Sequence, residues 1–99
     1  YVIENGVIRK DTSVSQAIII SSVKTSDITA SSMSLIVIGS ILDGATYSFK
    51  AITIGTYQSI SPNSLSESVV TDVGSNISLR IIITDNNTRI DTIGMYWRW

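Results

Sequence analysis

The stretch Ala45-Thr46-Tyr47-Ser48-Phe49-Lys50-Ala51 alternates between apolar and polar side chains along its whole length. Successive side chains of a β-strand point to opposite faces of a sheet, so the apolar members of this stretch share one face. The pattern predicts a strand with one buried face, entered through a tight turn at Asp43-Gly44. Tyr47 and Phe49 are therefore predicted core residues.

Other β-branched segments predict further strands on both sides of this one. Asn5-Gly6 favours a hairpin turn within residues 1–10, because both positions of a type I′ turn need a positive φ. The remaining strands are predicted at residues 14–23, 32–41, 69–73, 76–84 and 89–99. Residues 24–27 and 85–88 are predicted turns, and Gly94 predicts a bulge in the last strand.

Two segments carry more specific expectations. Ile18, Ile19 and Ile20 are consecutive, which indicates a strand covered on both faces. Residues 56–68 are rich in serine and contain the only proline, Pro62. We expect this segment to be a long surface loop, with or without a short edge strand.

No window has the apolar period of a helix, and about seven or eight short strands follow one another at close spacing. The sequence predicts one all-β domain over residues 1–99, folded as an antiparallel, jelly-roll-like β-sandwich or as a closed barrel. The chain starts at Tyr1 and not at Met, so we expect an excised domain, a processed product or a fragment of a longer chain.

Composition excludes several kinds of partner. Apolar residues make up 43% of the 99 residues and charged residues only 15%, with a net charge of −1. Apart from Arg9-Lys10 the basic residues are scattered, so no basic stripe is available for nucleic acid. No apolar run approaches the roughly 18 residues of a membrane-spanning helix, so we expect no membrane insertion.

The sequence contains no histidine and no cysteine, which removes the commonest general base, thiolate nucleophiles and thiolate metal ligands. The Gly-x-Ser-x-Gly turn of serine hydrolases is also absent. Four aspartates, Asp27, Asp43, Asp72 and Asp85, lack the spacing of a calcium loop and fit turn positions. We therefore expect no enzyme activity, no cofactor and no metal.

The aromatic residues at the end of the chain are the main candidate site. Alternation places Met95, Trp97 and Trp99 on one face of the last strand, and Tyr96 and Arg98 on the other. Met95 and Trp97 are predicted core residues. Tyr96, Arg98 and Trp99, together with Tyr57 in the serine-rich segment, are candidates for a ligand platform or a subunit interface, because aromatic rings and arginine favour both.

The segment from Ser34 to Phe49 contains Leu42-Asp43-Gly44-Ala45-Thr46-Tyr47-Ser48-Phe49 after an apolar strand. This motif resembles the turn that joins two core strands in jelly-roll carbohydrate-binding modules. Fibronectin type III domains have a similar motif, but it lies nearer their C-terminal end, so this sequence resembles them less. The Ile-, Ser-, Thr- and Asn-rich composition is similar to that of bacteriophage tail-fibre and baseplate receptor-binding domains.

These resemblances imply a non-catalytic module of a virion or extracellular assembly that recognises host cell-surface glycan. They also imply a homo-oligomer, with a trimer favoured. The alternative is a structural or oligomerisation module that docks other chains through the Trp97 and Trp99 edge and the N-terminal hairpin.

Overall fold

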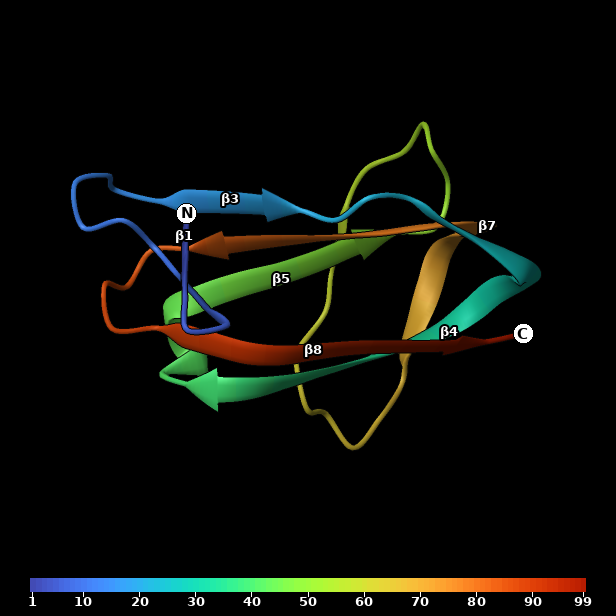
Figure 1. Cartoon of the computed structure of the whole chain (residues 1–99). Helices are drawn as coiled ribbons and strands as arrows, with labels where there is room; N and C mark the ends of the chain where they lie inside the picture. Colours follow the sequence, from blue (N-terminus) through green and yellow to red (C-terminus); the bar gives the residue numbers. More distant parts are fainter.

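Eight antiparallel strands form a single sheet that folds over on itself (Figure 1). The computed structural model describes residues 1–99. The only helical element is the 3-10 turn η1 (Leu42–Gly44). The strands are β1 (Val2–Glu4), β2 (Val7–Arg9), β3 (Ala17–Ile20), β4 (Lys24–Ser40), β5 (Ala45–Lys50), β6 (Gln58–Ser59), β7 (Ser68–Ile83) and β8 (Arg89–Arg98).

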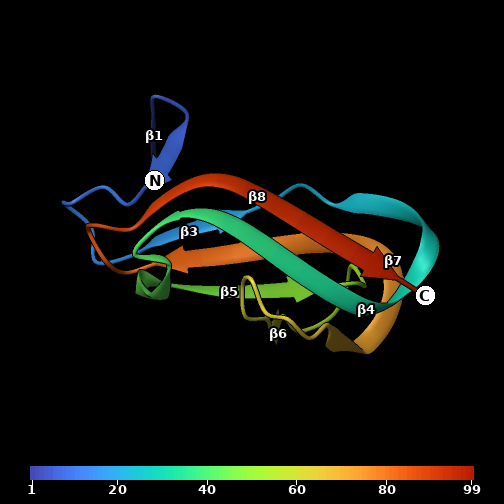
Figure 2. The same ribbon diagram turned by 90° about the horizontal axis from the view of Figure 1, so that it is seen from below.

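Two long strands, β4 and β7, bend and so divide the sheet into two layers (Figure 2). One layer has the order β1-β2-β8-β4 and ends on the first half of β7. The other places β3 and β5 on either side of the second half of β7, with β6 beyond β5. The two ends of the strand order do not pair with each other. The fold is thus an open antiparallel β-sandwich, as predicted, and the closed barrel is wrong.

Inward-facing rows of side chains from both layers form the core. The predicted row on β5 is confirmed, since Tyr47 and Phe49 are 5% and 0% exposed. The alternate residues Ile77, Leu79, Ile81 and Ile83 of β7 are also buried, as are Met33, Leu35 and Val37 of β4. Strand alternation therefore accounts for the apolar rows of the core, although Ser48 and Ser78, which lie between members of these rows, are also buried.

Two predictions about the first third of the chain are wrong. Ile18 and Ile20 are 49% and 59% exposed, and only Ile19 turns toward the core, because β3 borders its layer and has one covered face. Residues 24–27 do not form a turn. They begin β4, where Lys24 pairs with Ile77, because polar side chains are compatible with a strand whose outer face is in water.

The predicted breaks within the last third also need correction. The strands predicted at 69–73 and 76–84 form one strand, β7, which bends near Gly74. Gly94 is not a bulge, because it pairs regularly with Ile36. The irregularity lies at Asp91, which is left without a partner between two pairs, Ile38–Thr92 and Gly39–Ile90.

The Asn5-Gly6 hairpin is confirmed. Both residues have positive φ, 53° and 78°, as the predicted type I′ turn requires. The hairpin pairs with the rest of the sheet at one position, Ile8 with Ile90, and projects from the body of the domain (Figure 2). No helix of the structure is long and apolar enough to cross a membrane.

Candidate functional site

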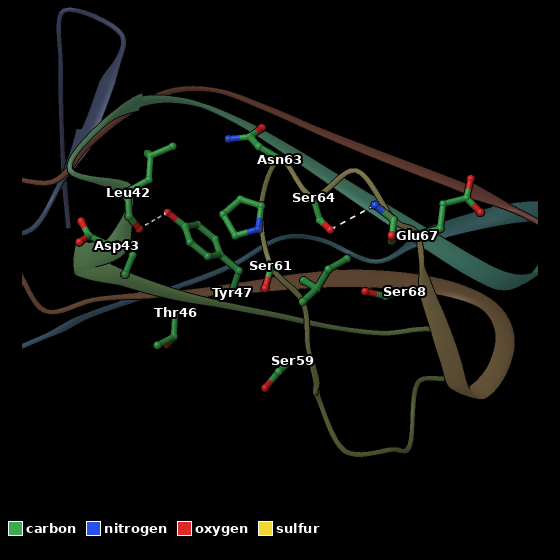
Figure 3. A pocket seen from close by; sticks show the side chains of 14 residues that line it. Leu42, Asp43, Thr46, Tyr47, Ser59, Ser61, Asn63, Ser64, Glu67 and Ser68 are labelled. Atoms are coloured by element: carbon green, nitrogen blue, oxygen red, sulfur yellow. Dashed lines mark hydrogen bonds between the residues drawn. The ribbon is translucent and has the colours of Figure 1, made fainter.

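A groove of about 660 Å³ lies on one open side of the sandwich, between the start of β5 and the segment of residues 59–68 (Figure 3). Polar side chains form most of its lining. The lining residues are Leu42, Asp43, Ala45, Thr46, Tyr47, Ser59, Ile60, Ser61, Pro62, Asn63, Ser64, Ser66, Glu67 and Ser68. The predicted loop of residues 56–68, with β6 as its short edge strand, therefore supplies one wall of the groove.

Asn63 attaches this wall to β4. Its Nδ2 donates to the carbonyl of Val37 over 2.9 Å, and its Oδ1 accepts from the amide of Val37 over 3.1 Å. Its backbone amide donates to the carbonyl of Leu35 over 2.8 Å. Asn63 has φ 60°, which asparagine tolerates better than most residues. One residue thus bonds to the backbone edge of β4 in place of a neighbouring strand.

Gln58 holds the other part of the segment in the same way. Its amide nitrogen donates to the carbonyl of Val69 over 2.6 Å, and its amide oxygen accepts from the backbone of Thr71 over 2.9 Å. The backbone amide of Ile60 donates to the carbonyl of Tyr47 over 3.0 Å. The groove wall is therefore bonded to β4, β5 and β7, although it contains only two strand residues.

The opposite wall begins at a strained residue. Ile41 has φ 53°, in a left-handed region that β-branched residues rarely adopt. Its carbonyl accepts from Oγ1 of the buried Thr88 over 2.6 Å and from the amide of Gly44 over 3.1 Å. These bonds hold η1 in place, so Leu42 and Asp43 reach the groove in a fixed position. Such strain persists where surrounding contacts over-determine it, and it clusters at functional sites.

Tyr47 lies between this wall and the core. Its hydroxyl donates to the carbonyl of Leu42 over 2.9 Å (Figure 3). Burial raises the pKa of this phenol above its ordinary value, and the negative charge of Asp43 raises it further. The phenol therefore stays protonated and keeps its bond to Leu42 throughout the neutral range.

The groove presents hydroxyls and carboxylates, and no lysine or arginine lines it. Asp43 and Glu67 lie toward opposite ends (Figure 3). The hydroxyls between them belong to Thr46, Ser59, Ser61, Ser64, Ser66 and Ser68. Hydroxyls both donate and accept, whereas ionised carboxylates only accept. The lining can therefore bind an uncharged ligand that carries many hydroxyls. No group of three acidic side chains is arranged to hold a metal ion.

The predicted C-terminal residues follow their alternation as far as Trp97, and Trp99 departs from it, because it is exposed although it falls on the face of Met95 and Trp97. Met95 and Trp97 are partly buried and pack against the core, whereas Tyr96 and Trp99 are 60% and 77% exposed. The side chain of Arg98 is 73% exposed, and its Nε lies 2.8 Å from Oε2 of Glu67. Arg98 thus reaches the rim of the groove through an ion pair.

Tyr57 lies elsewhere. Nζ of Lys50 and Cζ of Arg80 are 4.9 Å and 4.3 Å from the centre of its ring. It lines a second, smaller hollow of about 180 Å³, to which no residue of β8 contributes. The structure therefore does not join Tyr57 with Tyr96, Arg98 and Trp99 into one site.

No family model, curated protein or solved structure matches this chain. Two open features of the fold, the groove and the exposed C-terminal aromatics, are the candidates for a functional site.

Sequence reasoning missed the groove itself. It treated Asp43 as a turn residue, and it did not single out Asn63 or Glu67. The available signal was the run of serines in residues 56–68, which places many hydroxyls on one loop. The folding of that run onto Leu42–Tyr47 depends on contacts between distant residues, and strand periodicity does not report these.

Proposed function

We propose that this chain is a non-catalytic β-sandwich module that recognises a cell-surface glycan as part of a virion or extracellular assembly. The binding site in this proposal is the groove between β5 and residues 59–68. The observation that carries it is the convergence of hydroxyl groups and two carboxylates on a concave surface of about 660 Å³. Hydroxyls that donate and accept, together with carboxylates that accept, can bond several hydroxyls of one ligand at the same time.

The chemistry of the lining favours a neutral saccharide. The carboxylates of Asp43 and Glu67 accept hydrogen bonds from sugar hydroxyls, and such charge-assisted bonds are stronger than neutral ones. Asp43 carries a negative charge that no lysine or arginine of the lining balances, whereas Glu67 is paired with Arg98 at the rim. Asp43 therefore disfavours acidic sugars at its end of the groove. Pro62 and Ile60 supply apolar surface for the C–H faces of a sugar ring.

The experiment is a screen of immobilised neutral and acidic glycans, followed by titration of the neutral glycans that bind. Asp43→Ala removes a lining carboxylate, and Asp27→Ala removes an exposed one outside the groove. We expect Asp43→Ala to weaken binding about tenfold, because the lost bonds involve a charged acceptor. Asp27→Ala should bind like the wild type. Equal affinity for the two variants, or a preference for acidic glycans, contradicts the proposal.

The exposed end of β8 supports a second candidate, a structural module that docks other chains of an assembly. Trp99 is 77% exposed, and a large exposed aromatic ring is typical of an interface. Trp99→Ala distinguishes the two. Lost assembly with unchanged glycan binding supports docking at this end. Lost glycan binding with unchanged mass places the sugar at the C-terminal aromatics instead of the groove.

A further inference from the structure

Strand β3 borders the layer formed by β3, β7, β5 and β6, and it pairs only with β7 (Figure 1). The amide of Ser21 donates to the carbonyl of Leu79 over 2.9 Å. In an antiparallel pair, the backbone groups of alternate residues point toward the partner. Ile19 and Ser21 therefore bond to β7, and the amides and carbonyls of Ile18 and Ile20 point away from the sheet.

The other free edges of the sandwich carry features that hinder pairing with another strand. The side chain of Asn63 occupies the edge of β4, and the side chain of Gln58 occupies the edge of the first half of β7. β8 carries a bulge at Asp91 and a charge at Arg98. β1 and β6 are three and two residues long.

β3 is also short, with four residues, but no side chain, bulge or charge blocks its edge. The sequence carries no charge between Asp11 and Lys24. Ile18 and Ile20 are 49% and 59% exposed on its outer face, beside the half-buried Ile82 of β7. An uncharged, isoleucine-rich edge with free amides and carbonyls is a template for one more strand.

We propose that two copies of this chain pair through β3 in antiparallel fashion, about a twofold axis that passes beside Ile19. This register places Ile18 opposite Ile20 of the second copy. Each such pair exchanges two N–H···O bonds, and its side chains meet on the outer face. The layer then continues from one copy into the other, through an interface that uses the same surface twice.

The sequence around β3 favours a second copy as the occupant. In the symmetric register Ile18 and Ile20 lie opposite each other, so the two exposed isoleucines of one copy cover those of the other. The segment from Thr12 to Val23 carries no charge, so this antiparallel pairing places no like charges opposite each other along the paired strands.

The pairing is independent of the proposed glycan site. The groove lies beyond β5, and β3 is on the other side of β7. Both grooves of such a dimer stay open. Failure of glycan binding therefore says nothing about the dimer, and a monomeric chain says nothing about the groove.

Sedimentation equilibrium over a range of protein concentrations tests the pairing. We expect a dimer mass for the wild type. Ile18→Lys places a charge at the pairing edge and should raise the dimer dissociation constant by at least about tenfold. The matched control is Ile38→Lys, which replaces a similarly exposed isoleucine on β4 and should leave the dimer intact. A monomer or trimer mass for the wild type overturns the proposal, as does a dimer unaffected by Ile18→Lys.

A crosslink gives a second readout that does not depend on affinity. The chain has no cysteine, so one introduced thiol reports on one contact. In the proposed register Ile19 faces Ile19 of the second copy at a Cα separation of about 4.5 Å, which a disulfide spans. Mild oxidation of Ile19→Cys should give a covalent dimer, and Ile38→Cys should not. The register is overturned if the two variants crosslink equally, or if Ile19→Cys does not crosslink at all.

Discussion

The indole Nε1 of Trp97 donates a hydrogen bond of 2.8 Å to Oγ of Ser26, across 71 residues of sequence. Ser26 lies in the first half of β4, and Trp97 near the end of β8. The bond fixes the indole against the core and satisfies its only polar group. Trp99 follows in the chain with most of its side chain in water.

Substitutions at these residues should separate the roles of the two tryptophans. Trp97→Ala should destabilise the fold by about 3 kcal/mol, because it removes a large ring packed against the core. Trp99→Ala should change the free energy of unfolding by less than about 0.5 kcal/mol. Urea unfolding measures both. If Trp99→Ala unfolds the domain as readily as Trp97→Ala, both rings belong to the core.

The hydrogen bond has its own test. Trp97→Phe and Ser26→Ala each remove one partner, and a double-mutant cycle isolates their interaction. We expect a coupling energy of about 1 kcal/mol, the usual net value for such a bond. Additive effects of the two changes contradict the bond.

Asn63 should stabilise the fold through two separable effects. Asn63→Gly keeps the positive φ accessible but removes both side-chain bonds to Val37, and should lower the free energy of unfolding by about 1–2 kcal/mol. Asn63→Ala removes the same bonds and adds backbone strain. This variant should therefore lower the free energy of unfolding by about 1 kcal/mol more than Asn63→Gly does. Thermal or urea unfolding checks the order. An alanine variant as stable as the glycine variant contradicts the strain argument.

Tyr47 should make stability fall at alkaline pH. Burial and Asp43 raise its pKa in the folded state above the ordinary value of 10.0. The unfolded state therefore ionises first, so this contribution is complete below about pH 10 and is lost as pH rises through the folded pKa. Tyr47→Phe should be about 1 kcal/mol less stable at neutral pH, for loss of the bond to Leu42.

The measurement is the difference in unfolding free energy between wild type and Tyr47→Phe across the alkaline range. The difference should shrink above about pH 10, since the phenylalanine has no proton to lose. A constant difference shows that Tyr47 does not titrate in the folded protein as its surroundings indicate.

Gly6→Val should loosen the N-terminal hairpin and leave the sandwich folded. Gly6 has φ 78°, which a β-branched residue resists. The hairpin pairs with the rest of the sheet only at Ile8 with Ile90, and Ile8 is its hydrophobic side chain that packs against the core, so most of the sandwich does not depend on it. Hydrogen exchange should show faster exchange of the amides in β1 and β2, with the core amides of β5 and β7 unchanged. Loss of core protection contradicts this independence.

The strands of this fold with one covered face could be predicted from sequence. The rows at Tyr47 and Phe49 and at Ile77 to Ile83 alternate because burial selects every second side chain. Asn5-Gly6 encodes its own turn, since two adjacent residues suit positive φ.

The rest depends on contacts between distant residues. Lys24–Asp27 has the composition of a turn, but pairing of Lys24 and Thr25 with β7 makes it strand. The isoleucines of β3 have the composition of a buried strand, but the strand lies at the border of its layer. The groove needs Asn63 to meet Val37, and neither residue indicates the other in sequence. Alternation did predict that Trp97 packs inward, whereas Trp99, which it places on the same face, is exposed at the end of β8.

Amide chemical-shift mapping with a panel of neutral oligosaccharides tests most directly whether the groove is the recognition site. We predict saturable shifts confined to residues 42–47 and 59–68, and their loss in Asp43→Ala but not in Asp27→Ala. No saturable shift with any neutral oligosaccharide, or shifts centred on Tyr96 to Trp99, would contradict it.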